Sequence, residues 1–388
     1  MEKKIKLGII GIGNMGTGHT KNILTGKCPE FELVAAADIN PDRLAWAKES
    51  LSPDVTYFDD ALKMLDSGLI EACMVCVPHY DHPKYAMECM KRGIHVMVEK
   101  PAGVYTKQVR EMNEEAKKHP EVVFGMMFNQ RTNCLHRKMR ELVQSGKYGR
   151  VRRANWLITN WYRSQFYYDS GDWRATWSGE GGGVLLNQCP HQLDLWQWIL
   201  GMPKKVQAFM RYGQWHDIEV EDDVTALMEY EDGHTGVFIT STADAPGTNR
   251  FEITLERGKL VCEDDKLLLW KLKESERDFC RTAKGGFDKP ECTFEEVETD
   301  GQNPQHEGVL NAWAAAILRG EPMVAGGEEG INGLTLSNAM HLSSWLNQTV
   351  EIPFDEDLFL DELDKRCETS AAKNTAAVTF DTSGSYNS

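Results

Sequence analysis

Short apolar runs alternate with amphipathic segments over the first third of the chain. The apolar runs are IKLGII, FELVAAAD, VTYF, EACMVCV, IHVMVEK and VVFGMM, and segments such as DDALKMLD and HPKYAMECMKRG separate them. Strands and helices that alternate at this spacing are typical of a parallel sheet covered by helices on both faces. The pattern therefore predicts a doubly wound α/β domain over residues 1–127.

The pattern changes after residue 150, where apolar and polar positions alternate. In DVTALMEYEDGHTGVFITSTA the alternating segments flank Asp232-Gly233, a dipeptide favoured in tight hairpin turns. RFEITLERGKLVCEDDKLLLWKL predicts further antiparallel strands, and apolar residues recurring at three and four positions predict helices at 306–319 and 329–347. We expect a second α/β domain over 128–368 whose strands are mostly antiparallel; the resemblance described below implies that they form one large, open sheet. The small and polar residues 369–388 predict a C-terminal tail, either loose or laid on a neighbouring subunit.

Composition and charge narrow the classes of partner. The 388 residues are 41% hydrophobic and 26% charged, and no stretch approaches the roughly 18 to 20 apolar residues of a membrane helix. Because the N-terminus also lacks the features of a secretory signal, we expect a soluble, cytoplasmic protein without a membrane partner. A net charge of −16 with scattered Lys and Arg argues against nucleic acid. The ten cysteines follow no framework spacing, so we expect reduced thiols, with Cys73 and Cys76 buried in a strand rather than forming a redox or metal site.

A glycine-rich turn follows the first predicted strand. Gly11-Ile12-Gly13-Asn14-Met15-Gly16 lies between a strand and a plausible helix, the context that a dinucleotide-binding turn requires. Asp38 ends the next strand, 22 residues after Gly16, where a carboxylate accepts hydrogen bonds from ribose hydroxyls and repels a phosphate. The cofactor expected is therefore NAD ahead of NADP, although the nearby Arg43 keeps NADP open.

Two further segments should line the same crevice. Glu99-Lys100-Pro101 ends a strand at the carboxyl edge of the sheet, where open parallel sheets bind ligands. Lys100 is either a solvated strand end or a positioned side chain, and we favour the second. The loop Val77-Pro78-His79-Tyr80-Asp81-His82 ends the preceding strand. No partner at metal-ligand spacing accompanies His79 and His82, so we expect no metal.

A third segment begins at Gly181-Gly182-Gly183. If a helix is entered from these glycines, Asn187, His191 and Asp194 fall on one stripe, with Pro190 near the first turn. His191 is either a satisfied core histidine or a functional group.

Aromatic residues crowd the preceding region. Six of the eleven tryptophans lie between residues 156 and 198, among Tyr162, Arg163, Tyr167, Tyr168 and Arg174. Aromatic faces beside polar groups suit a sugar, whereas an aromatic core or a subunit interface is an equal alternative for any single tryptophan.

These segments in this order resemble the Gfo/Idh/MocA family over roughly residues 4–355. The segments are GIGNMG, VPHYDHPKYAMECMKRGIHVMVEKP, FNQRTNCLHRKMRELVQSGKYGRV and GGGVLLNQCPHQLDLWQWILG. The resemblance implies a Rossmann domain followed by an α/β domain whose open sheet often forms the interface of a homo-oligomer. It also implies NAD(P)-dependent oxidation or reduction of a hydroxyl on a sugar, polyol or glycoside.

The resemblance also implies roles for single residues. Lys100 corresponds to the catalytic lysine and His191 to the proton-transfer residue of the family. Asn187 stands where the family has Asp, and its amide cannot ionise. The predicted cofactor-binding residues are Gly11, Gly13, Asn14, Met15, Gly16, Asp38, Arg43, Pro78, His82, Glu99, Lys100 and Asn129. The predicted substrate-binding residues are Asn187, Asp194, Tyr162, Arg163, Trp173 and Arg174.

The function expected is NAD-dependent hydride transfer at a secondary hydroxyl of a sugar or glycoside. The NQCPHQLD form resembles a subgroup that acts on glucose-type rings, so carbon 3 is favoured, and the acidic chain suits a neutral sugar better than a phosphorylated one. Three alternatives stay open: an NAD-dependent glycosidase that oxidises carbon 3 transiently, an inositol or polyol dehydrogenase, and a non-catalytic NAD or sugar sensor.

Overall fold

The computed structural model describes residues 3–371 and 373, so most of the predicted tail at 369–388 lies outside the described residues. The N-terminal part is a six-stranded, all-parallel sheet in the order β3-β2-β1-β4-β5-β6. Its strands are β1 (Ile5–Ile10), β2 (Phe31–Ala37), β3 (Thr56–Phe58), β4 (Ala72–Val75), β5 (His95–Val98) and β6 (Phe124–Met126). Its helices are α1 (Asn14–Leu24), α2 (Pro41–Ser50), α3 (Ala61–Leu65), α4 (His82–Met90) and α5 (Thr106–Lys118). This confirms the predicted doubly wound sheet.

The strand order explains where a ligand can enter this sheet. Every residue of β4 is buried, as expected for a central parallel strand covered on both faces. The chain crosses from β1 to β2 and β3 on one side, and to β4, β5 and β6 on the other. The reversal between β1 and β4 opens a crevice at the carboxyl ends of these strands.

The second sheet has nine strands in the order β14-β13-β12-β11-β7-β10-β9-β8-β15. They are β7 (Val151–Ile158), β8 (Lys205–Tyr212), β9 (Glu221–Glu229), β10 (Thr235–Ser241), β11 (Asn249–Leu255), β12 (Gly258–Glu263), β13 (Lys266–Leu272), β14 (Cys292–Glu296) and β15 (Val350–Glu351). Every pair is antiparallel except β7 and β10. The hairpin predicted at Asp232-Gly233 joins β9 to β10, and the positive φ of 85° at Gly233 suits its turn.

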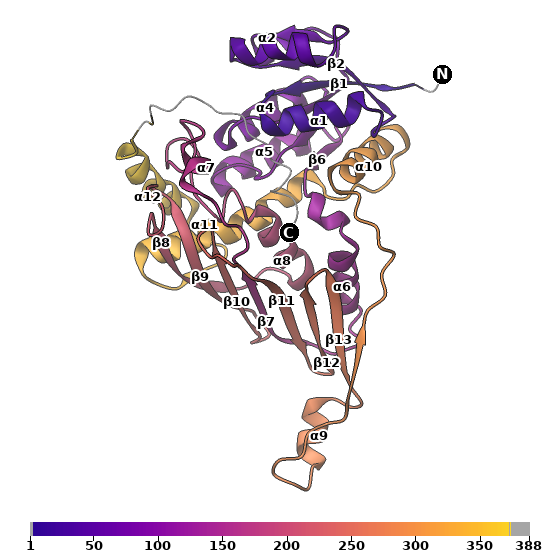
Figure 1. The fold of residues 1–388 in the computed structure, drawn as a ribbon, viewed down its shortest axis with the longest axis vertical. Coiled ribbons are helices and arrows are strands. Elements are labelled where there is room, and N and C mark those ends of the chain that lie inside the picture. Colours follow the sequence, from indigo (N-terminus) through magenta and orange to yellow (C-terminus); the bar gives the residue numbers. More distant parts are fainter. Residues whose placement is uncertain (1–2, 372, 374–388) are drawn as a thin grey trace.

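Of the remaining helices, η1 lies between β4 and α4, and the others lie between β6 and the end of the described chain. They are η1 (His79–Asp81), η2 (Asn129–Thr132), α6 (Cys134–Gln144), α7 (Gln165–Asp169), α8 (Pro190–Leu200), α9 (Glu276–Thr282), α10 (Gln305–Arg319), η3 (Gly327–Glu329), α11 (Gly330–Leu346) and α12 (Glu356–Glu368). In Figure 1, α6, α8 and α11 run along one side of the second sheet, and α9 extends beyond it on an arm. The predicted helices at 306–319 and 329–347 correspond to α10 and α11.

One helix returns from the second half of the chain to the first. α10 lies beside the N-terminal part in Figure 1, and its buried Trp313 packs against Phe31 of β2 with ring centroids 5.2 Å apart. Val309 and Leu310 join the same apolar cluster as Ile5 and Leu7 of β1. The apolar core around β1 and β2 is therefore completed by residues that come more than 270 positions later in the sequence.

The outer surface and the cysteines bear on further predictions. On the uncovered face of the second sheet, Phe209 and Leu227 are exposed, and a homo-oligomer formed through this face stays a prediction. None of the ten cysteines forms a disulfide. Cys73 is buried in β4 as predicted, but the prediction is wrong for Cys76, which follows the strand and is half-buried. Among residues 3–371 and 373, we find no helix with the length and apolar character that crossing a bilayer demands.

Candidate active site

A cavity of about 860 Å³ lies at the carboxyl ends of the first sheet and extends to segments of the second half of the chain. The predicted residues that line it are Gly11, Gly13, Asn14, Met15, Asp38, Arg43, Pro78, His82, Glu99, Lys100, Asn129, Arg163, Trp173, Arg174, Asn187 and His191. Gly16, Tyr162 and Asp194 do not belong to this lining among the described residues. The structure thus brings most of the predicted site together in one place.

The glycine turn between β1 and α1 forms a cradle with open space at its centre. Gly11 has φ of 91°, and a Cβ added there would lie 2.3 Å from the Cys76 carbonyl oxygen. A Cβ on Gly16 would lie 1.9 Å from the Gly11 carbonyl oxygen, so Gly16 serves the close approach of helix and turn. No atom lies within 4 Å of a Cβ on Gly13. This arrangement fits a dinucleotide, whose pyrophosphate requires bare backbone at a helix N-terminus.

Asp38 and Arg43 both hold the turn. Asp38 accepts hydrogen bonds from the backbone N–H groups of Ile12 (2.7 Å) and Asn40 (2.9 Å). Arg43 donates from Nε (2.9 Å) and Nη2 (2.6 Å) to the Ile12 carbonyl oxygen, and its guanidinium lies 4.3 Å from the centre of the Trp46 ring. The carboxylate therefore lines the cavity while the guanidinium is held by the backbone of the turn.

Glu99 is held in place by His19 of α1, a residue that sequence reasoning missed. Its buried Oε1 lies 2.6 Å from Nε2 of His19 on α1, and its Oε2 accepts from the Lys100 backbone N–H (3.1 Å). Burial alone would raise the pKa of Glu99, but the contact with His19 outweighs it and holds the pKa at about 2. His306 of α10, also missed, lines the cavity near His19 with their ring centroids 5.4 Å apart. The contact between Glu99 and His19 therefore stabilises the turn that carries Lys100.

The β4–α4 loop is tied to the same turn. The ring of His82 contacts the Pro101 carbonyl oxygen through Nδ1 (2.6 Å) and the Val77 carbonyl oxygen through Nε2 (2.8 Å). His82 thus joins two walls of the cavity. Within the described part of the chain, no group of three His, Cys, Asp or Glu side chains is arranged to hold a metal ion.

Lys100 and His191 line the same cavity but come from different parts of the fold. Lys100 comes shortly after β5 of the first sheet, whereas His191 lies in α8, beside the second sheet. The Lys100 ammonium donates from Nζ to the backbone oxygen of Asn187 (3.0 Å), and burial lowers its pKa although Glu99 and Glu180 oppose this effect. His191 lies in the first turn of α8, and Nδ1 of its ring is buried without a hydrogen-bond partner among the described residues. Burial, together with Lys100 and His306, holds the pKa of His191 well below its ordinary value. At neutral pH the site therefore holds a neutral imidazole beside an ammonium whose proton is easier to lose than usual.

The structure corrects the predicted stripe of Asn187, His191 and Asp194. α8 begins at Pro190, because proline has no N–H to continue a helix from the glycines but suits the first helical turn. The preceding turn is held by Glu221, which accepts from the backbone N–H groups of Gly183 (2.8 Å) and Leu185 (3.0 Å). Asn187 therefore lies in a turn before the helix, where it lines the cavity.

Asp194 points away from the cavity. It is fully buried, and its two oxygens accept from Nε and Nη2 of Arg131, each at 2.7 Å. Arg131 also contacts Glu329 at 2.7 Å. This carboxylate joins α8 to η2 and supports the fold, in contrast to its predicted role in binding substrate.

The aromatic region divides between the site and the core. Trp161 and Trp173 line the cavity, whereas Trp156 and Trp196 stack on Phe251 in the core with ring centroids 4.2 and 5.7 Å apart. Tyr162 is 55% exposed and lies outside the lining. The tryptophans thus divide between the cavity wall and the core, and the binding of a sugar by Trp161 and Trp173 stays a prediction.

Tyr167 brings the two predicted arginines together. The Cζ atoms of Arg163 and Arg174 lie 5.2 and 4.6 Å from the centre of its ring, and Arg174 donates to its hydroxyl (2.9 Å). The Tyr167 hydroxyl also accepts from the side-chain amides of Asn187 (3.1 Å) and Gln188 (3.2 Å). These polar groups gather beside the aromatic walls of the cavity.

Glu180 is a further acidic residue of this region that sequence reasoning missed. It is 1% exposed, accepts from the Ala175 backbone N–H (2.6 Å) through Oε2, and accepts from Nδ2 of Asn187 through Oε1. Burial raises its pKa to about 7, although Arg174, Ala175 and Asn187 favour the ionised form. Its position between Gly179 and three glycines shows no periodic pattern, so the sequence offered no signal beyond that of a loop.

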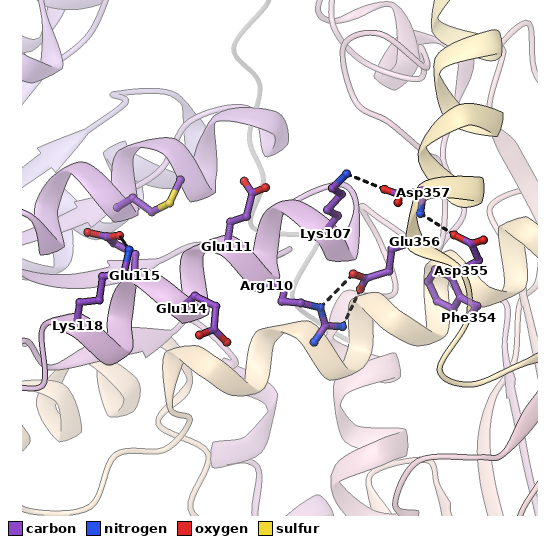
Figure 2. Close-up of a pocket in the computed structure, with 11 residues that line it drawn as sticks. Lys107, Arg110, Glu111, Glu114, Glu115, Lys118, Phe354, Asp355, Glu356 and Asp357 are labelled. Carbon is purple, nitrogen blue, oxygen red and sulfur yellow. Dashed lines mark hydrogen bonds and ion pairs between the residues drawn. The ribbon is translucent and has the colours of Figure 1, made fainter.

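A second hollow, of about 720 Å³, lies between α5 and the start of α12. Figure 2 shows that its charged side chains contact one another: Lys107 donates to Asp357 (2.6 Å) and Arg110 to Glu356 (3.0 and 2.7 Å). These pairs connect the first half of the chain to its last described helix. Because most of the charged side chains of this hollow are paired, we assign no chemistry to it.

Models of one protein family match both halves of the chain. The model described as an oxidoreductase family with an NAD-binding Rossmann fold matches residues 5–126. The model of the GFO/IDH/MocA C-terminal domain matches residues 136–261. The two matches follow the order of the two sheets.

Individual relatives agree with these models. The chain is 24% identical to myo-inositol 2-dehydrogenase of Thermotoga maritima over 362 residues, which is 90% of this chain and 98% of the relative. It is 26% identical to D-glucoside 3-dehydrogenase of Escherichia coli over 247 residues, 59% of this chain and 68% of the relative. The solved structure of the WlbA dehydrogenase from Chromobacterium violaceum with NADH and UDP-GlcNAcA is 26% identical, with a TM-score of 0.77 over 92% of this chain and 98% of that one. This chain therefore belongs to the Gfo/Idh/MocA family of oxidoreductases, and its N-terminal part is an NAD-binding Rossmann domain.

Proposed function

We propose that this protein is an NAD-dependent dehydrogenase of a secondary hydroxyl on a sugar or glycoside, with carbon 3 of a glucose-type ring as the favoured position. The observation that carries the proposal is the placement of Lys100 and His191 in one cavity with the dinucleotide cradle. Relatives named as inositol and glucoside dehydrogenases support the substrate class.

The two residues have complementary tasks. His191, neutral because its pKa is depressed, accepts the proton of the substrate hydroxyl. Lys100 donates a hydrogen bond to the same oxygen and stabilises the negative charge that develops there. Bound NAD would supply the hydride acceptor.

The remaining lining residues support the substrate and cofactor assignments. Trp161, Trp173 and Tyr167 offer faces for the C–H groups of a sugar ring. Arg163 and Gln188 offer hydrogen-bond donors for its hydroxyls. At the other end, the Asp38 carboxylate suits the ribose hydroxyls of NAD and repels the extra phosphate of NADP.

The test is incubation of the purified protein with NAD and a panel of glucosides, inositols and free sugars, following NADH absorbance and products together. We expect NADH and a ketosugar from a glucoside. Lys100→Met and His191→Asn should each lower kcat at least a hundredfold while NAD still binds, and Lys107→Met on the surface should change neither. Full turnover in both site variants would refute the assignment.

The same products separate the alternative activities. Release of free sugar without accumulating NADH would indicate a glycosidase that oxidises its substrate transiently. NADH formation with inositols alone would move the substrate class to polyols. Binding of NAD and sugar with no product of either kind would indicate a sensor.

A further inference from the structure

We infer that Glu180 is a positioning residue of this active site, whose carboxylate holds the Asn187 amide and places beside Lys100 the negative charge that an amide at position 187 lacks. The inference rests on the proposed function, because it assigns Lys100 and the cavity beside it to the reaction. Glu180 does not line the cavity itself, so it acts through Asn187.

The contacts join Glu180 and Lys100 through the same residue. The side-chain amide of Asn187 donates to Glu180 and to the hydroxyl of Tyr167 (3.1 Å), while its backbone oxygen accepts from Lys100 Nζ (3.0 Å). Both donors of the Asn187 amide thus have acceptors. Oδ1 of this amide takes part in neither of these hydrogen bonds, and we infer that it accepts a hydrogen bond from a substrate hydroxyl.

The carboxylate is needed for this orientation. An ionised carboxylate only accepts hydrogen bonds, so it selects the NH₂ side of the amide. A protonated Glu180 would be a donor as well and would permit the amide to turn its oxygen inward. A buried carboxylate is costly unless its oxygens are satisfied, and here Ala175 and Asn187 supply the donors.

Several charged and titratable groups act on Glu180 or respond to it, among them Tyr168, whose pKa is raised by burial and also by Glu180. Arg174 favours its ionised form, whereas Glu221 opposes it. His79 contacts its backbone oxygen through Nδ1 (3.3 Å), and burial holds the pKa of this histidine well below its ordinary value. In turn, Glu180 raises the pKa of Lys100 against the lowering by burial. Ionised Glu180 therefore helps to keep Lys100 protonated.

The pH dependence follows from these directions. Burial raises the pKa of Glu180 to about 7, whereas that of His191 lies well below its ordinary value. As the pH falls through 7, Glu180 gains a proton, the amide loses its fixed orientation and Lys100 loses a neighbouring negative charge. A step in kcat near pH 7 is therefore expected to belong to Glu180 rather than to His191.

The experiment compares Glu180→Gln with Glu180→Asp, with the double variant Glu180→Gln/Asn187→Asp, and with Glu114→Gln. Glu114 is an exposed glutamate paired with Lys117 and serves as the matched control. The first measurement needs no turnover: the rate of Lys100 acetylation by acetic anhydride is followed against pH by peptide mass spectrometry. The second measurement is kcat against pH with the best substrate of the panel.

We expect Glu180→Gln to lower the midpoint of Lys100 acetylation by about one pH unit, a tenfold change in the fraction of neutral amine. It should lower kcat about tenfold at pH 7.5, remove the step near pH 7 and leave the Kd for NAD unchanged. Glu180→Asp, which keeps the charge, should retain the Lys100 midpoint. The double variant, which moves the charge to position 187, should recover most of the lost kcat.

Three results would overturn the inference. One is a wild-type midpoint and a wild-type pH profile in Glu180→Gln. Another is an equal shift of the midpoint in Glu114→Gln. The third is a loss of activity in Glu180→Gln that follows a lower melting temperature and is not recovered in the double variant, since this describes a purely structural residue. If no sugar of the panel is oxidised, the proposed function fails, but the acetylation midpoints still decide the role of Glu180.

Discussion

Replacing Asp194 by Asn separates a role in the fold from a role in binding substrate. Asp194 and Arg131 are both buried and share two hydrogen bonds of 2.7 Å. Removing one charge of a buried pair costs about 3–5 kcal/mol. Arg131 keeps its contact with Glu329 (2.7 Å), and an amide can still accept one hydrogen bond. We therefore expect a loss near the lower end, about 3 kcal/mol in the free energy of unfolding.

The assay is urea unfolding followed by tryptophan fluorescence, with KM measured on the same preparations. Asp300→Asn is the matched control, because Asp300 pairs with Arg137 at 2.8 and 2.9 Å on the surface, where solvent screening leaves an ion pair little effect on stability. KM for the sugar should stay within about twofold in both variants, since Asp194 does not line the cavity. Equal stability of the two variants, together with a tenfold rise in KM for Asp194→Asn alone, would refute the structural role.

Three further outcomes follow from the cofactor end of the site. Gly16→Ala should weaken NAD binding more than tenfold in a fluorescence titration, because its Cβ would meet the Gly11 carbonyl oxygen at 1.9 Å, whereas Gly18→Ala has open space and should bind as the wild type does. Asp38→Ser should raise the ratio of kcat/KM for NADP over that for NAD at least tenfold, because it removes a charge that repels the extra phosphate. Glu99→Gln should lower stability by about 3 kcal/mol at pH 7, because the pKa of Glu99 is about 2 against an ordinary 4.5. A depressed carboxylate pKa stabilises above the unfolded value, so this difference in unfolding free energy should shrink as the pH falls from about 5 towards 2.

Local patterns were enough to predict the two sheets. β4 is a continuous apolar segment because it is covered on both faces, and the same holds for β1 after Lys6 and for β5 after His95, which leaves a signal in the sequence itself. The Asp232-Gly233 turn is equally local, since the two residues favour the conformation that joins β9 to β10. Gly11, Gly13 and Gly16 predicted the dinucleotide cradle because this turn, too, is defined by neighbouring residues in the sequence.

The residues that sequence reasoning misplaced or missed owe their positions to contacts with residues distant in sequence. Asp194 has helical spacing from His191, but its partner Arg131 lies 63 positions earlier and turns it away from the cavity. The role of Glu180 depends on its contact with Asn187 and on its burial, and a loop pattern predicts neither. His306 lines the cavity because α10 returns to the first sheet. Periodicity within a segment does not indicate contacts with distant segments, so the roles of these residues could be assigned only from the three-dimensional structure.

The return of α10 also explains how the two halves of the site keep their geometry. Lys100 lies shortly after β5 and His191 lies in the first turn of α8, so their relative position depends on how the two sheets are joined. The exposed ion pairs between α5 and α12 contribute little to stability, because solvent screens them. Trp313 of α10, by contrast, is fully buried against the first sheet, and truncating such a side chain typically costs about 3–5 kcal/mol. Because His306 begins the same helix and lines the cavity, the element that joins the sheets also forms a wall of the site. Disturbing α10 should therefore lower turnover as well as stability, whereas removing the α5–α12 pairs should leave turnover unchanged.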